Sequence, residues 1–290
     1  MISALQFQGL RFVGVALVFL PSWTERPLFE LIWIVYRTVQ AKEIRRVRDH
    51  VRQSPMAKSL QIKDIYWNLF CNGLDSLRYL IQPNTLGNRV AIVHGELLTN
   101  LLALNKPVVV VSIHMGAFEM LHRVLAGFGA PVRLIVSKHL PRGIERYLHK
   151  ARAVANLVTY NPGESAQLLR DLLRKGGILA ILCDQSRHGK GVPLPLLGRL
   201  TELWTRIPCA ACSAGATVLS IRAIRRGRTH EIHFETLYAP ETSADSLNQE
   251  LAKEFETWIL DSPAQWSWNY PRLWQEFCYS TVDTTKNVSL

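Results

Sequence analysis

The sequence has few cysteines, and their arrangement fits neither a disulfide framework nor a metal site. Its five cysteines in 290 residues are an odd number at irregular spacing, which favours a reducing compartment. Cys209 and Cys212 form a C-x-x-C motif, but the alanines around them predict a close-packed helix and not a redox centre. There is no second C-x-x-C, and no H-x3-H or H-E-x-x-H cluster. We therefore expect no metal and no cofactor.

The sequence also lacks a serine hydrolase motif and any linker that would divide the chain. No G-x-S-x-G nucleophile elbow occurs, which argues against an α/β-hydrolase. No Ser/Gly/Pro-rich linker, internal repeat or low-complexity segment is present, and the 48% hydrophobic content is enough for one substantial core. We expect one main domain over residues 41–290, preceded by a separate segment over residues 1–40.

No uninterrupted apolar run is long enough to span a bilayer. Phe12–Leu20 is apolar, but Arg11 precedes it and Pro21 ends it, whereas a transmembrane helix needs ~20 residues. A second apolar stretch, Leu28–Val39, follows. The region also holds aromatic residues typical of a membrane interface, Trp23, Trp33 and Tyr36. We expect apolar helices that associate with the membrane at residues 1–40; a helical hairpin packed on the domain is the alternative. Residues 1–10 contain no Lys or Arg and no A-x-A site follows the first run, so a secretory signal is not expected.

Acidic residues are outnumbered by basic ones. The chain has 34 Lys and Arg against 23 Asp and Glu, a formal charge of +11, and its arginines gather in the runs KEIRRVRDHVR and RAIRRGR. Anionic phospholipid, an acidic carrier protein and nucleic acid would all be attracted. The chain has no recognisable nucleic-acid motif, and its aromatic residues are not interleaved with the basic runs. We expect no nucleic-acid partner, although a non-catalytic basic binding protein remains the alternative from another class.

Hydrophobic periodicity predicts an α/β fold. Strands are expected at 108–113, 132–136, 178–182, 217–223 and 231–236. Helices are expected at 57–81, 95–104, 118–127, 142–155, 164–174 and 246–260. Because strands and helices alternate through the middle of the chain, we expect a largely parallel central sheet flanked by helices, with ligands beyond the carboxyl ends of its strands.

His114 and Glu119 are the most informative pair of residues. They lie five positions apart in VVVVSIHMGAFEML, after a β-branched run typical of a buried strand and at the start of a helical pattern. On one continuous helix their side chains would point about 140° apart. Across a turn they would meet, and Gly116 suits such a turn. His114 would then act as a general base with Glu119 as its orienting partner. A core histidine is the alternative.

Three sequence blocks resemble the lipid A late acyltransferase branch of the lysophospholipid and glycerolipid acyltransferase superfamily. HMGAFE is similar to its H-x4-D/E signature, and the segment LLRKGGILAILCDQSRHGKGVPLPLLG is similar to a second block that delivers an Asp-Gln pair. PAQWSWNYPRLW is similar to the closing P-x-Q-W-x-W motif. The chain differs from the branch at Ala117 and Phe118, where Asn-Trp is usual, and at Ser137 and Lys138, where an Arg is usual. These differences affect the expected acceptor more than the expected chemistry.

The resemblance implies acyl transfer from a thioester, on acyl carrier protein or coenzyme A, to a hydroxyl of a lipid acceptor. The implied acceptor is an anionic glycolipid of the lipid A type, and another lysophospholipid, glycolipid or amino-lipid is the alternative. The implied location is the cytoplasmic face of the inner membrane, on anionic lipid. Besides the catalytic pair, the expected substrate-binding residues are Gly116, Lys138, Arg142, Arg146, Arg152, Asp184 and Gln185. For the arginines a solvated helical face is the alternative. Asp184 would position the acceptor or a basic residue, or would merely cap the turn after its strand.

Overall fold

A seven-stranded sheet forms the centre of the computed structural model, which describes residues 19–82, 84, 86, 89–135, 156–186, 191–240 and 242–274. Its strand order is β1-β9-β8-β2-β5-β3-β4. The strands are β1 (Val90–Val93), β2 (Val108–Ser112), β3 (Val132–Ile135), β4 (Leu157–Tyr160), β5 (Ile178–Leu182), β8 (Thr217–Arg226) and β9 (Thr229–Tyr238). β8, β2, β5, β3 and β4 share one direction; β9 is antiparallel to β8, and β1 runs parallel to β9. The largely parallel sheet and the single α/β domain are confirmed.

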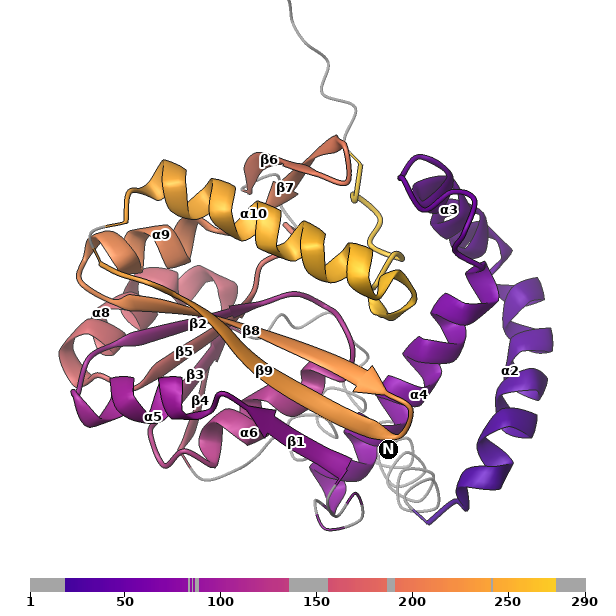
Figure 1. Ribbon diagram of the computed structural model, residues 1–290, viewed down its shortest axis with the longest axis horizontal. Helices are drawn as coiled ribbons and strands as arrows, with labels where there is room; N and C mark the ends of the chain where they lie inside the picture. The colour runs from indigo at the N-terminus through magenta and orange to yellow at the C-terminus, as the bar shows by residue number, and fades with distance from the viewer. Residues whose placement is uncertain are drawn as a thin grey trace, which may run out of the picture.

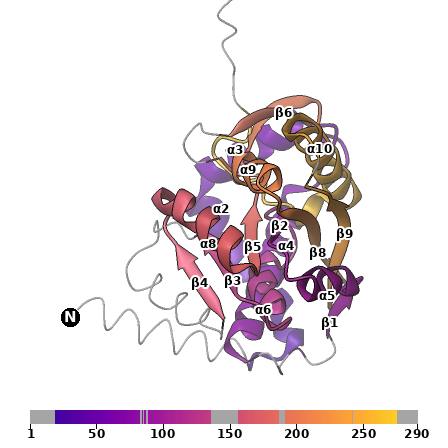
Figure 2. The same ribbon diagram turned by 90° about the vertical axis from the view of Figure 1, so that its left-hand side faces the viewer.

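Helices cover both faces of the sheet (Figures 1 and 2). They are α5 (Glu96–Ala103), α6 (Leu121–Ala126), α8 (Ser165–Lys175), α9 (Arg206–Ser213) and α10 (Ala244–Asp261). The central strand β2 is buried along its whole length. Val109 and Val111 face a core built with α8, α9 and α10, whereas Val108 and Val110 face a second core built with α5 and α6. The alternation of side chains along a strand therefore explains why an unbroken valine run belongs at this position.

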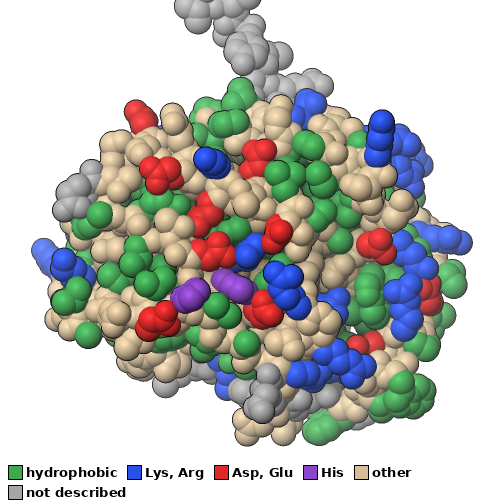
Figure 3. Space-filling model, viewed as in Figure 1, with side chains coloured by type: hydrophobic (Ala, Val, Ile, Leu, Met, Phe, Trp, Pro, Cys, Tyr) green, Lys and Arg blue, Asp and Glu red, His purple; other side chains and the backbone are tan. Residues whose placement is uncertain are grey.

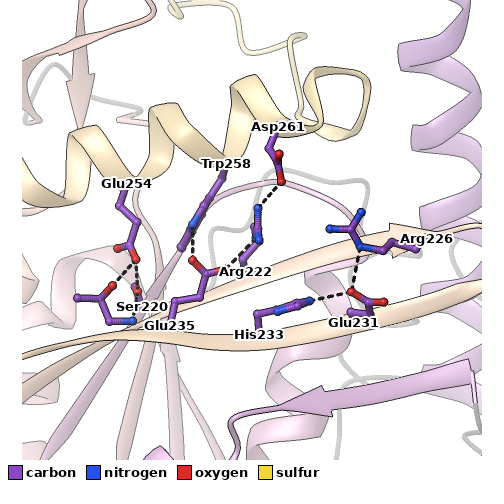
Figure 4. Close-up of polar contacts among 10 residues, drawn as sticks. Ser220, Arg222, Arg226, Glu231, His233, Glu235, Glu254, Trp258 and Asp261 are labelled. Carbon is purple, nitrogen blue, oxygen red and sulfur yellow. Dashed lines mark hydrogen bonds and ion pairs between the residues drawn. The ribbon is translucent and has the colours of Figure 1, made fainter.

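Polar contacts join α10 to β8 and β9 (Figure 4). Glu254 accepts hydrogen bonds from Ser220, Thr236 and Tyr238, and Trp258 donates to Glu235. Burial raises the pKa of the Glu254 carboxyl, although these hydrogen bonds act in the opposite direction. The expected apolar stripe of this helix packs in the core, which confirms the 246–260 prediction.

Three helices from the first part of the chain lie along one side of the domain, at the right of Figure 1. They are α2 (Glu25–Val39), α3 (Ala41–Arg52) and α4 (Ile62–Ile81). Trp33 and Tyr36 of α2 pack against Tyr66 of α4, so these two aromatic residues face inward. No helix among the described residues is long and apolar enough to cross a membrane. Most of the Phe12–Leu20 run lies outside the described residues.

Several elements differ from the sequence expectation. The sequence did not predict strands β1 and β4 or the antiparallel pair β6 (Val192–Leu196) and β7 (Arg199–Leu203). β6 contains two prolines, which are disfavoured within strands, and β4 and β7 contain polar residues. The helix expected from residue 57 begins at Ile62, after a series of turns. Short 3-10 helices complete the fold: η1 (Ser22–Thr24), η4 (Phe118–Met120), η5 (Pro162–Glu164) and η6 (Pro263–Gln265). The helix expected at 142–155 lies outside the described residues.

Cys209 and Cys212 lie on the short helix α9, as their alanine-rich surroundings predict. Both thiols are buried and neither is in a disulfide within the described part of the chain, and burial raises the pKa of Cys209 to about 11. A thiol that stays protonated at neutral pH is a poor nucleophile.

Candidate active site

Two neighbouring parallel strands deliver His114 and Asp184 to the same edge of the sheet. Strand β2 ends at Ser112 and β5 ends at Leu182, and these two residues are register partners. His114 and Asp184 each follow two residues later. Because parallel strands in register end together, the two side chains meet although they are 70 positions apart in the chain.

Asp184 binds both the ring and the backbone of His114. The His114 Nδ1 lies 2.7 Å from Asp184 Oδ1, and the His114 amide donates to both carboxylate oxygens at 3.1 Å. The Asp184 side chain is 1% exposed, whereas the His114 side chain is 24% exposed. Since a carboxylate only accepts hydrogen bonds, Nδ1 carries the ring proton and Nε2 is the basic nitrogen. A partly exposed imidazole oriented in this way is suited to take a proton from a bound hydroxyl.

Trp266 completes the hydrogen bonds of Asp184. Its indole Nε1 donates to Asp184 Oδ2 at 2.8 Å, and its side chain is fully buried against Trp268. Trp266 and Trp268 therefore form part of the core beneath His114. Because Trp266 and Trp268 are both fully buried, neither side chain lies at a membrane interface.

The turn after β2 is fastened to the segment that contains Trp266. Met115 forms a β-bridge with Trp266, Gly116 donates to the Gln265 carbonyl, and Ser267 donates to the His114 carbonyl. Gln265 in turn binds the backbone of Arg225 on β8 through both ends of its side chain. The closing motif noted in the sequence is therefore part of the frame that holds His114.

Gly116 has the turn conformation that its type suggested. Its φ is +57°, and a Cβ at this position would lie 2.3 Å from the carbonyl oxygen of Ala223 on β8. Only glycine allows this approach. Gly116 thus lets the turn after β2 pack directly against the backbone of β8.

Glu119 lies within η4, directly after Phe118, whose ring packs edge-on against the His114 ring at a centroid distance of 4.8 Å. The hydrogen bond of the His114 ring goes to Asp184 and not to Glu119. The orienting role that the sequence assigned to Glu119 therefore remains a prediction, and Asp184 has the contact that such a role requires. Gln185 is half-buried next to Asp184.

Four predicted substrate-binding residues lie outside the described residues: Lys138, Arg142, Arg146 and Arg152.

Trp266 was expected from its motif but was not predicted to contact the site. Its signal in the sequence was the motif alone, because no spacing rule links position 266 to position 184.

A histidine held by a buried carboxylate at the carboxyl edge of a parallel sheet has the geometry that activation of a hydroxyl or water requires. The model of one family, bacterial lipid A biosynthesis acyltransferase, matches residues 78–275, about two thirds of the chain. The protein therefore belongs to this family and is an acyltransferase that acts on a lipid acceptor. A comparison with curated proteins gives no match. The matched range contains the whole sheet and the site but not α2 and α3.

Proposed function

We propose that the enzyme transfers a fatty acyl chain from a thioester, on acyl carrier protein or coenzyme A, to a hydroxyl of a lipid A-type glycolipid. The observation that supports this most is the oriented His114 ring in a chain of the lipid A acyltransferase family. The ring is partly exposed and its orienting carboxylate is buried, as expected when a large substrate approaches from solvent or membrane.

In the proposed reaction His114 Nε2 takes the proton of the acceptor hydroxyl. The oxygen attacks the thioester carbonyl, a C–O ester bond forms, and the C–S bond breaks. The thiolate leaves with the proton that His114 accepted, so the histidine returns to its starting state. Asp184 stabilises the imidazolium that exists between these two proton transfers, and Trp266 keeps the carboxylate in position.

Glu119 remains a proposed member of this site, where the sequence signature places it. Its position beside Phe118 brings it to the same turn as His114. The proposed substrate-binding group is completed by Gly116, Gln185 and the basic residues of 138–152. Transfer to another lipid is the second candidate, which is favoured by the residues that differ from the branch, Ala117, Phe118, Ser137 and Lys138.

We also propose that the enzyme works on an anionic membrane, at the cytoplasmic face of the inner membrane. The outer side of α2 exposes Leu31, Val35 and Val39, at fractions of 64%, 56% and 71%. These residues recur at helical spacing, as in a helix that lies on a bilayer. The net charge of +11 favours the attachment of the protein to anionic lipid.

The function is tested by mass spectrometry of total lipids and lipid A from cells that lack this protein, complemented with the wild type or with His114→Ala. We expect a species heavier by one acyl chain only with the wild type, and its identity gives the acceptor and the chain length. A heavier lipid outside the lipid A fraction would support the second candidate. Identical spectra from both complemented strains would contradict catalysis by His114.

A further inference from the structure

A basic cavity of about 380 Å³, whose lining does not include His114, lies between α3, β7 and the end of the described chain. It is lined by Lys42, Arg45, Arg46, Asp49, His50, Gln53, Arg199 and Trp274. Four of these side chains are permanent cations at neutral pH, and one is an acid. The Asp49 carboxylate is 59% exposed and lies 4.0 Å from Arg52, so it offsets little of the positive charge. The cavity therefore attracts a compact anion.

The wall of the cavity is built by specific contacts between distant segments. His50 is buried, with Nδ1 2.8 Å from the carbonyl oxygen of Trp268, and Trp274 Nε1 donates to the His50 carbonyl. Arg46 donates to the carbonyl of Asn269, and Arg199 lies over the Trp274 ring. These contacts distinguish the cavity from a solvated face of α3.

Arg46 also has a donor with no partner in the part of the chain that the structure describes. Its Nε is buried, and no described residue accepts a hydrogen bond from it. An anion in the cavity would lie beside the Arg46 guanidinium, which lines it, and an anion with several acceptor oxygens pairs well with such a group. Phosphate is the common anion whose charge and oxygens suit a group of arginines.

The position of the cavity indicates where the phosphate comes from. Helix α3 begins two residues after α2 ends at Val39, so the cavity adjoins the helix with the exposed apolar side. Lys and Arg side chains and hydrophobic side chains gather along the same side of the molecule, where Figure 1 shows α2 and α3 (Figure 3). Such a combination suits the boundary between acyl chains and headgroups.

We propose that this cavity binds the phosphate of an anionic phospholipid headgroup while the outer side of α2 lies on the same bilayer. The inference rests on the proposed membrane association and adds a defined lipid site to it. Through Trp266–Trp274, the site is connected to the segment that holds Asp184 and His114. A lipid bound there would thus fix the enzyme on the membrane close to its catalytic frame.

The experiment compares two double variants of α3 with equal loss of charge. Lys42→Gln with Arg45→Gln removes two cations of the cavity, whereas Arg48→Gln with Arg52→Gln removes two exposed cations of the same helix outside it. Binding to vesicles of phosphatidylcholine with phosphatidylglycerol, and to phosphatidylcholine alone, is measured by co-sedimentation. Arg199→Gln probes the opposite wall of the cavity. Melting temperatures confirm that each variant is folded.

We expect the cavity pair to weaken binding to anionic vesicles at least about tenfold and the control pair to weaken it about threefold or less. Arg199→Gln should also weaken it. Equal losses in both pairs would overturn the site and leave membrane association by diffuse charge. A wild type that fails to bind anionic vesicles would instead overturn the proposed membrane association itself. Acyl transfer to a detergent-dispersed acceptor, measured in parallel, reports on the proposed catalytic function separately.

Inorganic phosphate and coenzyme A serve as soluble probes of the same cavity. Weak binding of phosphate that is lost in the cavity pair supports a phosphate site. Tight binding of coenzyme A that is lost in the cavity pair, with vesicle binding unchanged, would overturn the headgroup assignment and identify the occupant as the acyl donor.

Discussion

At the scale of single residues, the proposed mechanism depends on the tautomer of the His114 imidazole. Asp184 is buried, accepts from Nδ1 and the backbone of His114, and receives a further hydrogen bond from Trp266. Three donors on one carboxylate fix its position, so the ring has little freedom to turn. A general base needs this restriction, because only the correctly placed nitrogen can receive the proton.

Asp184→Asn should reduce kcat by about 10²–10⁴-fold, the range typical of general acid-base catalysis. The amide can donate to Nδ1 and so favour the wrong tautomer. The reaction rate with an acyl thioester is measured together with the melting temperature, since a large loss of stability would explain inactivity without a role in orientation.

Glu119→Gln serves as the comparison, and from the sequence signature we expect a folded protein with much reduced turnover. Full activity of Glu119→Gln would remove Glu119 from the mechanism. Full activity of Asp184→Asn, with an inactive Glu119→Gln, would instead assign the orienting role to Glu119.

At the scale of elements, the turn after β2 depends on its contact with β8. Gly116 combines a positive φ with a backbone neighbour that leaves no room for a methyl group. Gly129 has φ +83°, and apart from its chain neighbours no described residue has an atom within 4 Å of the position of its Cβ. Substitution of Gly129 therefore measures the cost of the positive φ alone, whereas substitution of Gly116 adds the cost of a clash between the new methyl group and β8.

Gly116→Ala should lower the free energy of unfolding well beyond the effect of Gly129→Ala, which we expect to cost about 1–2 kcal/mol for the backbone conformation alone. Gly116→Ala should also reduce kcat, because the turn after β2 must shift and His114 moves with it. Urea unfolding and acyl transfer rates measure the two effects. Equal destabilisation by both substitutions would show that the backbone of β8 moves away from the methyl group without a measurable loss of stability.

At the scale of the whole molecule, one side of the domain combines exposed apolar residues with basic residues. The inner side of α2 packs on α4 through aromatic rings, whereas the first arm of the hairpin that the sequence offered as an alternative lies mostly outside the described residues. The outer side remains exposed. The two alternatives that the sequence offered for this helix, packing and membrane contact, therefore concern two different sides of it.

Replacing Leu31, Val35 and Val39 with Ser should weaken binding to anionic vesicles at least about tenfold, since each buried aliphatic side chain contributes about 1.5–3 kcal/mol. The control replaces three exposed apolar residues elsewhere, Leu104, Val158 and Leu237, with Ser. Co-sedimentation measures both. Equal binding of the two triple variants would contradict a membrane role for this side of α2.

Much of the fold followed from the sequence because its strands are strongly apolar. The runs that became β2 and β5 predicted buried parallel strands, and the general rule for such sheets placed His114 and Asp184 at the edge where ligands bind. The periodicity of 246–260 likewise predicted the helix that covers the sheet. These features depend on the order of apolar and polar residues within a short segment, which can be read from the sequence without knowing the fold.

The tertiary structure decided which groups meet. The register of Ser112 with Leu182 brings Asp184 to the His114 ring, and the return of the chain after α10 brings Trp266 to Asp184. The basic cavity likewise needs α3, β7 and Trp274 together. The sequence by itself indicated the most apolar strands and the periodic helices, because apolar periodicity is local, and its resemblance to the acyltransferase family indicated the type of chemistry. Long-range register and packing determined the partners, because residues 70 or more positions apart have no fixed separation until the sheet forms.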